Sequence, residues 1–246
     1  MQPQPVHYLP IATTVVAAVF LCVLVRHSLR RRSGPHLLWW ALGVFTYGVG
    51  TGLESAITLV GNSVFLTKAW YVAGALLGGY PLAQGSVYLL MKRKIANLLT
   101  AITLPLVVIA AVFVFASPVL EANLLAHMPS GSILAWTWVR WLTPFINLYA
   151  VLFLVGGAIW SAIRYARQRG EGDGARALGN SLIAFGALLP GIGGSMAKAG
   201  MVEALYVGEF VGLLFIWAGY RVCVRAGAPA RAQPAPEATS SPAAAT

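Results

Sequence analysis

Three ionisable side chains that could take part in binding or catalysis lie well inside long apolar stretches of the sequence: Glu54, Arg140 and Glu209. Each is about five to seven residues from one end of its stretch, so a helical rise of about 1.5 Å per residue puts all three roughly 8–10 Å deep. A charge at that depth in a membrane costs several kcal/mol unless it is paired or hydrated. The sequence therefore predicts that the two carboxylates and the guanidinium share one layer.

Polar residues at helical spacing surround these charges. Thr51 and Thr58 fall on the helix face of Glu54, and Asn147 falls on the helix face of Arg140. We interpret the layer as a polar pocket that is open to the outside and binds a small ligand. Its predicted lining is Glu54, Arg140, Asn147 and Glu209, its aromatic walls are Trp70, Tyr71, Trp136 and Tyr206, and its rim is Lys68 and Lys198.

Simpler interpretations of the same residues stay open. Glu54, Arg140 and Glu209 could form an ion network that only fixes the positions of the helices. The long side chains of Lys68 and Lys198 could extend to lipid headgroups. Aromatic residues at this height could belong to the interfacial belt of a membrane protein.

Several membrane chemistries lack the residues that they need. A retinal protein of the microbial type requires a Schiff-base Lys in its last helix, and 204–224 contains no Lys. Buried haem and intramembrane metal sites need ligands within the apolar stretches. The histidines instead fall in loops or at the ends of stretches: His7, His27, His36 and His127. Since no Ser or Cys has a His at matching depth either, we expect no enzymatic activity, metal or cofactor.

The elements that must position the charged layer are apolar helices. With 58% hydrophobic and 10% charged residues, the chain is far less charged than a soluble domain, for which about 25% is typical. Seven stretches approach or exceed the roughly 20 residues that a bilayer crossing needs. They are 8–25, 37–60, 65–91, 96–116, 133–163, 178–199 and 204–223. The sequence predicts an all-α integral membrane bundle of seven transmembrane helices over 1–225 and a disordered, Ala- and Pro-rich cytoplasmic tail over 226–246.

The basic residues predict the orientation of this bundle. Fourteen of the 17 Lys and Arg residues lie in alternate gaps between the stretches and in the tail, whereas 1–7, 61–62 and 117–132 contain none. Because basic loops stay in the cytoplasm, we expect a multi-pass protein of the plasma (inner) membrane with its N-terminus outside and its C-terminus inside. The net charge of +10 then faces membrane lipids rather than nucleic acid. Cys22 and Cys223 fall near the cytoplasmic side, where free thiols are expected.

Glycine spacing predicts close packing between the helices. The pairs Gly48/Gly52, Gly74/Gly78 and Gly208/Gly212 each have the small-xxx-small spacing that lets helix backbones approach. The stretch 178–199 also combines a helix breaker with residues that tolerate unusual backbone angles. We predict a helix kink there, with an unwound, substrate-coordinating segment as the alternative. The residues concerned are Pro190, Gly191, Gly193 and Gly194.

Part of the sequence carries a resemblance to a known group of proteins. The segments LWWALG at 38–43, GLE at 52–54 and KAWYVAGAL at 68–76 resemble the second and third helices of the bacterial seven-helix sensory region that precedes some histidine kinases. The chain is also similar to uncharacterised seven-helix proteins of high-GC bacteria. The resemblance implies a receptor-like sensor in which Glu54 is a functional position. Since no kinase follows the helices, its output would need a cytoplasmic signalling partner.

An internal similarity supports a different function. KAWYVA at 68–73 parallels EALYVG at 203–208, as expected if three helices, a linker helix and three further helices form a parallel repeat. Small-solute transporters with seven helices can be built in this way. A transporter is therefore the alternative to a sensor, and solute flux would separate the two.

Overall fold

A computed structural model of the chain describes residues 5–31, 34–168 and 170–227 and contains helices but no strand within these ranges. The 3-10 and π segments are η1 (Pro5–Tyr8), η2 (Tyr71–Leu76), η3 (Glu121–Asn123), η4 (Gly131–Ile133) and η5 (Val151–Val155). The α-helices are α1 (Leu9–Arg31), α2 (Pro35–Val60), α3 (Val64–Trp70), α4 (Tyr80–Leu90), α5 (Arg93–Ala116), α6 (Thr137–Ala150), α7 (Gly156–Arg167), α8 (Asp173–Lys198) and α9 (Val202–Ala226). The predicted all-α class is confirmed. The predicted tail lies outside the described residues from 228 onward.

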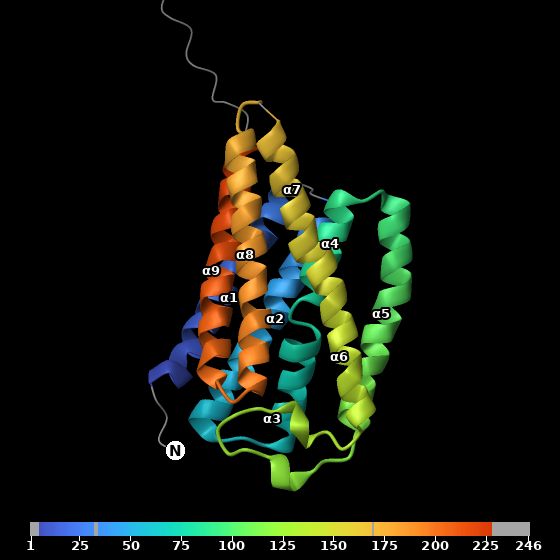
Figure 1. Ribbon diagram of the computed structural model, residues 1–246, viewed down its shortest axis with the longest axis vertical. Helices are drawn as coiled ribbons and strands as arrows, with labels where there is room; N and C mark the ends of the chain where they lie inside the picture. The colour runs from blue at the N-terminus through green and yellow to red at the C-terminus, as the bar shows by residue number, and fades with distance from the viewer. Residues whose placement is uncertain (1–4, 32–33, 169, 228–246) are drawn as a thin grey trace, which may run out of the picture.

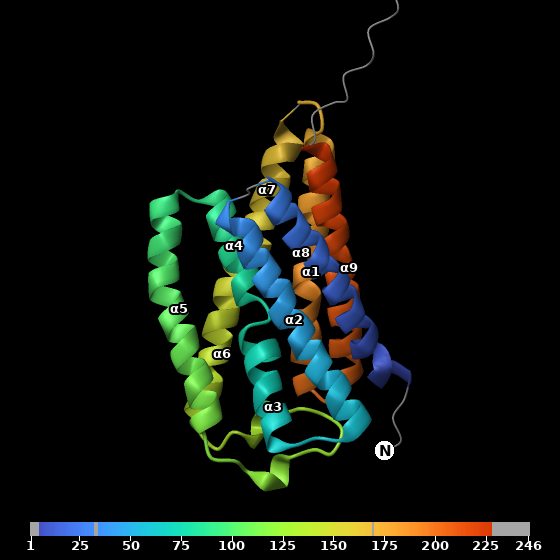
Figure 2. The same ribbon diagram turned by 180° about the vertical axis from the view of Figure 1, so that it is seen from behind.

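The helices run up and down along the long axis of the molecule (Figure 1). Five helical segments of the described chain are long and apolar enough to cross a membrane. They are Pro5–Arg30, Arg93–Ala116, Thr137–Arg167, Asp173–Lys198 and Val202–Ala226. The chain is thus a helical bundle of the multi-pass membrane class. Seen from behind, α2 and the α3–α4 segment lie alongside these helices in the same bundle (Figure 2).

The two ends of the bundle differ in charge. The turn between α7 and α8 lies at the end where α9 finishes, and the long connection 117–136 lies at the opposite end with the start of the described chain (Figure 1). Basic residues gather at the former end, at the close of α1, in the α4–α5 turn and at the close of α7 and α9. The connection 117–136 contains no Lys or Arg. The alternation seen along the sequence therefore becomes a separation of charge in space.

Two of the predicted stretches are interrupted by π-helical turns. The stretch 65–91 consists of α3, the π segment η2, a turn at 77–79 and α4. Gly78 is required in this turn, because a Cβ there would lie 2.4 Å from the carbonyl oxygen of Gly74. The stretch 133–163 likewise consists of α6, the π segment η5 and α7. Such π segments rotate the helix face that follows them and often occur near functional sites.

The tightest packing in the bundle joins α8 to α9 through glycines. A Cβ on Gly186 would lie 2.6 Å from the carbonyl oxygen of Gly212, and a Cβ on Gly193 would lie 2.6 Å from that of Ala204. α8 continues without interruption through Pro190, so the unwound alternative is absent from this helix. Of the residues predicted at the kink, Gly193 packs against α9. Gly191 and Gly194 meet no neighbouring atom within 4 Å of an added Cβ.

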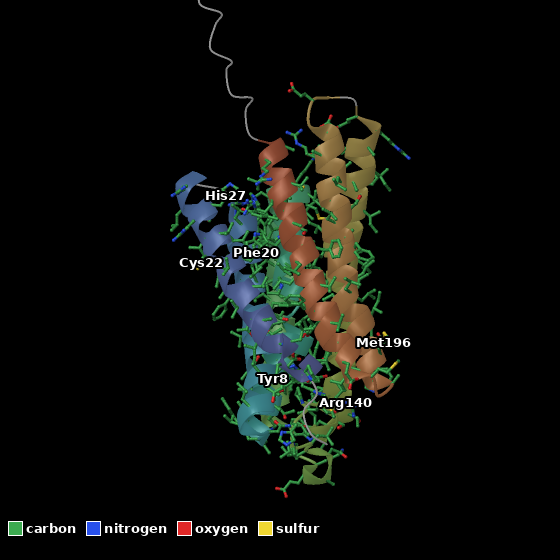
Figure 3. All side chains as sticks on the ribbon, turned by 90° about the vertical axis from the view of Figure 1, so that its left-hand side faces the viewer. Tyr8, Phe20, Cys22, His27, Arg140 and Met196 are labelled. Carbon is green, nitrogen blue, oxygen red and sulfur yellow. The ribbon has the colours of Figure 1, made fainter. Side chains whose placement is uncertain are left out.

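A buried apolar core fills the half of the bundle near the basic end. Phe20 of α1 is 2% exposed and stacks on Trp217 of α9 with ring centroids 5.5 Å apart. Farther along the same helices, the His27 ring is hydrogen-bonded to the Tyr220 hydroxyl. Figure 3 shows Phe20 and His27 on the side of α1 that faces α9. These contacts fix α1 and α9 to each other at this end of the bundle. Both cysteines, Cys22 and Cys223, are free thiols.

The α8–α9 contact yields a direct test with a matched control. Gly186→Ala is expected to lower the free energy of unfolding by about 1–3 kcal/mol, because the new methyl group displaces the α9 backbone. Gly194→Ala, in the same helix, adds its methyl group in open space and should leave stability unchanged or slightly raised. Thermal unfolding of the detergent-solubilised protein measures both. Equal melting temperatures for the two variants would contradict glycine-mediated packing here.

Candidate functional site

The structure brings two of the predicted residues together, Glu54 of α2 and Glu209 of α9. Glu54 is completely buried, and its carboxyl group interacts directly with that of Glu209. The Tyr47 hydroxyl, on the same helix as Glu54, donates a 2.9 Å hydrogen bond to the backbone carbonyl of Glu209. This bond ties α2 to α9 beside the carboxyl groups. Two helices that are far apart in the sequence therefore meet at a pair of acids.

Trp70 is held against this pair by the close approach of two backbones. Its Nε1 donates a 2.6 Å hydrogen bond to Oε1 of Glu54. A Cβ on Gly50 of α2 would lie 2.9 Å from Cα of Gly74, so η2 can pack this closely only because position 50 is glycine. A Cβ on Gly74 would in turn lie 3.4 Å from the Trp70 indole nitrogen. The glycine contact thus sets the position from which Trp70 reaches Glu54.

Several buried polar atoms at this place lack a hydrogen-bond partner. In the described part of the chain, four buried side-chain oxygens have no hydrogen-bond partner: Oε2 of Glu54, Oε2 of Glu209, Oγ1 of Thr58 and the Tyr206 hydroxyl. All four come from α2 and α9. Tyr206 is 1% exposed and lies three residues before Glu209 in α9, about one helical turn away. Each unsatisfied buried group costs about 1–3 kcal/mol, so this cluster favours anything that supplies protons or donors.

Arg140 does not join the two glutamates, so its predicted place in the pocket lining is corrected, and the alternative ion network of Glu54, Arg140 and Glu209 is not formed among the described residues. Its side chain is exposed on α6, and the only ion pair between the described residues joins Arg176 to Asp173. α6 packs against α4, α5 and η2. Figure 3 shows Arg140 near the end of the molecule where the described chain begins. Counting residues predicted the depth of Arg140 in its helix, whereas the direction of its side chain depends on how α6 packs.

The remaining predicted lining residues also divide between different places. Asn147 is exposed on α6. The Tyr71 hydroxyl is 2.9 Å from Oγ1 of Thr143, which joins η2 to α6. Trp136 packs on Phe113 and stacks on Trp138 beneath the long connection. Tyr71 and Trp136 therefore belong to a second cluster, and Trp70 lies between the two places, because its ring meets that of Tyr71 edge-on while its Nε1 donates to Glu54.

Lys68 has a structural contact rather than a place on a pocket rim. Its side chain is 7% exposed, and Nζ donates hydrogen bonds to the backbone carbonyls of Phe115 at 2.9 Å and Ser117 at 2.6 Å. These carbonyls lie at the C-terminal end of α5, where the helix dipole favours a positive charge. The predicted rim position of Lys68 is therefore corrected. Lys198 is exposed at the end of α8.

Comparison with models of known protein families finds none that matches this chain, and comparison with curated proteins finds none that is significantly similar. The site must therefore be interpreted from its own chemistry. Among the described residues, no group of three or more His, Cys, Asp or Glu side chains could hold a metal ion. Sequence reasoning missed the hydrogen bond from Trp70 to Glu54. Its only signal was an aromatic residue with a donor at a similar depth in the adjacent stretch.

The contact of Lys68 can be tested by removing its charge. Lys68→Met is expected to lower the free energy of unfolding by about 1–3 kcal/mol, because two carbonyls at the end of α5 lose a charged donor. Lys198→Met removes an equal charge from an exposed position and should change stability little. Thermal unfolding in detergent compares the two variants. An unchanged melting temperature for Lys68→Met would mean that the contact of Lys68 with the end of α5 contributes nothing to stability.

Proposed function

We propose that this protein is a receptor-like plasma-membrane protein with seven crossings and an external N-terminus, and that it binds a small, positively charged ligand at the Glu54–Glu209 pair. The observation that carries the proposal is the pairing of two buried carboxyl groups that have no basic partner among the described residues. The separation of basic residues to one end supports the orientation. The carboxyl pair then lies in the outer half of the membrane.

The chemistry of the pair selects the ligand class. Two adjacent carboxylates in an apolar setting repel each other, so a proton or a cation must neutralise at least one of them. An ammonium group carries three donors and one positive charge, and it can satisfy several of the four unpartnered oxygens at once. Trp70 and Tyr206 beside the acids provide aromatic faces that attract cations. Since Arg140 points elsewhere, nothing in this cluster would hold an anionic group of the ligand.

A ligand at this place would act on the relative position of α2 and α9. It would bridge Glu54 and Glu209, which belong to different helices, and would replace the repulsion between their carboxyl groups by attraction. A ligand shifts a conformational equilibrium only by binding the two states unequally, and the attraction of both carboxyl groups to one cation provides that difference. Trp70 would follow Glu54, and the π segment η2 directly after Trp70 is a plausible place for the backbone to adjust. A cytoplasmic partner would receive the change.

One observation favours the alternative of a small-solute transporter. Of the two similar segments, 68–73 reaches Glu54 through Trp70, and 203–208 directly precedes Glu209 in α9. A repeat that meets at a central site is typical of transporters. In vesicles that contain the purified protein, uptake of a radiolabelled amine would identify a transporter. Binding without uptake would identify a receptor.

The proposed topology predicts which positions an impermeant maleimide reaches in intact cells. In a background with Cys22→Ser and Cys223→Ser, Ser63→Cys and Ala126→Cys should be labelled from outside. Lys94→Cys and Glu171→Cys should be labelled only after permeabilisation. This pattern requires the α3–α4 segment, α5 and the α6–α7 segment to cross the membrane. If the Lys94 and Glu171 variants were labelled in intact cells like the Ser63 and Ala126 variants, the proposed crossings would be overturned.

The proposed ligand class predicts a charge-dependent thermal shift. Small primary amines should raise the melting temperature, by the equivalent of about 2.7 kcal/mol at a concentration one hundred times the dissociation constant. Glu54→Gln and Glu209→Gln should each abolish most of this shift while keeping the side-chain volume. Glu203→Gln, an exposed acid on the same helix as Glu209, should retain it. A shift with carboxylic acids instead of amines, or equal loss in Glu203→Gln, would refute the assignment.

A further inference from the structure

A second feature of the molecule lies near its basic end, on the outer surface of the bundle between α4 and α7. A hollow of about 280 Å³ is lined there mainly by apolar side chains, among them Val87, Leu90, Phe153 and Trp160. Its volume is close to the roughly 300 Å³ at which pockets for small ligands begin. The hollow does not border the Glu54–Glu209 pair, so it needs an explanation of its own.

The hollow arises where side chains are missing from α7. Gly156 and Gly157 follow the π segment η5 and line the hollow. A Cβ on Gly157 would lie 2.8 Å from Cδ1 of Leu90, so α4 and α7 are in contact at this point. A Cβ on Gly156 would meet only the carbonyl oxygen of Val151, at 3.8 Å. The space beside Gly156 is therefore open, and a longer side chain could occupy it without displacing the backbone.

The rim of the hollow opens away from the bundle. Trp160 is 66% exposed, Leu152 is 58% exposed and Leu90 is 44% exposed. In a multi-pass membrane protein, a surface of this composition faces the acyl chains of the bilayer. An exposed Trp near the basic end also fits the level at which indole rings meet lipid headgroups. The hollow is thus accessible to lipid rather than to a water-soluble ligand.

Positive charge lies directly beyond one end of this apolar surface. Lys92, Arg93 and Lys94 follow Met91, a lining residue, and Arg164 lies one helical turn beyond Trp160. All four side chains are exposed. The Arg93 guanidinium lies 5.6 Å from the centre of the Tyr88 ring, which turns it back toward α4. Neither 86–94 nor 151–167 contains an Asp or Glu that could neutralise this charge.

We propose that the hollow is a binding site for an anionic phospholipid. One acyl chain lies between α4 and α7 beside Gly156, and the phosphate is bound by the basic side chains at the α4–α5 turn and the end of α7. Charge complementarity selects this occupant, because anionic lipids attract basic residues near the membrane surface by about 1 kcal/mol per residue. A zwitterionic lipid would gain the apolar contact but little from the basic cluster. This site is independent of the proposed function of the carboxyl pair.

The test compares two lipids that have the same acyl chains and different headgroups. Dioleoyl phosphatidylglycerol added to the delipidated, detergent-solubilised protein should raise the melting temperature and remain bound in native mass spectra. Dioleoyl phosphatidylcholine should do so about tenfold more weakly. Glycerol phosphate, which has a phosphate and no chain, should have no effect. Equal protection by both lipids would overturn the assigned charge selectivity.

Variants separate the apolar and the charged halves of the site. Lys92→Gln with Arg164→Gln should weaken phosphatidylglycerol binding about tenfold, and Gly156→Leu should block it by filling the hollow. The matched control, Arg221→Gln with Arg225→Gln, removes the same charge from exposed positions at the end of α9 and should bind like the original protein. Equal weakening in this control would mean that diffuse surface charge attracts the lipid. Undiminished binding by Gly156→Leu would exclude the hollow.

Discussion

Close approach of helix backbones at glycines is the constraint on which this bundle depends. Helices within lipid gain little by hiding apolar side chains from one another, so they associate where small residues allow extensive backbone contact. Gly186 and Gly193 give α8 such a contact with α9, and Gly50 and Gly74 join α2 to η2. These contacts fix the angular position of each helix. They therefore decide which of the polar side chains in the apolar stretches meet.

The carboxyl pair follows from that arrangement. With η2 packed on α2, the Trp70 indole reaches Glu54, and with α9 held by Tyr47, Glu209 faces the same place. Glu54 receives one donor from the protein for two oxygens, and its Oε2 receives none. A network built only for stability would be expected to satisfy these atoms, since each one left unpaired costs free energy. These unpartnered oxygens are thus the strongest argument for the proposal that the cluster binds a ligand or a proton.

The sequence predicted the helical class and the separation of charge. Both follow from the lengths of the apolar stretches and from the positions of Lys and Arg between them, which can be read directly along the chain. It also predicted that Glu54 and Glu209 lie at one level. It placed Arg140 wrongly, because depth in a helix follows from counting residues whereas the direction of a side chain depends on packing. It could not foresee the π segments η2 and η5, which change the face that the next turn presents. Lys68 was misplaced for a related reason: its partners are backbone carbonyls of α5, which leave no trace in the residue types.

α9 is the element that connects the two halves of the molecule. It carries Glu209 in one half and, about three helical turns further along, Tyr220, whose hydroxyl is hydrogen-bonded to His27 near the basic end. Glycine contacts along its length join it to α8, so the two helices would move together. A change in the distance between Glu54 and Glu209 would consequently reach the end where α1 and α9 finish. A close-packed interior does not deform gradually. It transmits such a shift by changing from one packing arrangement to another.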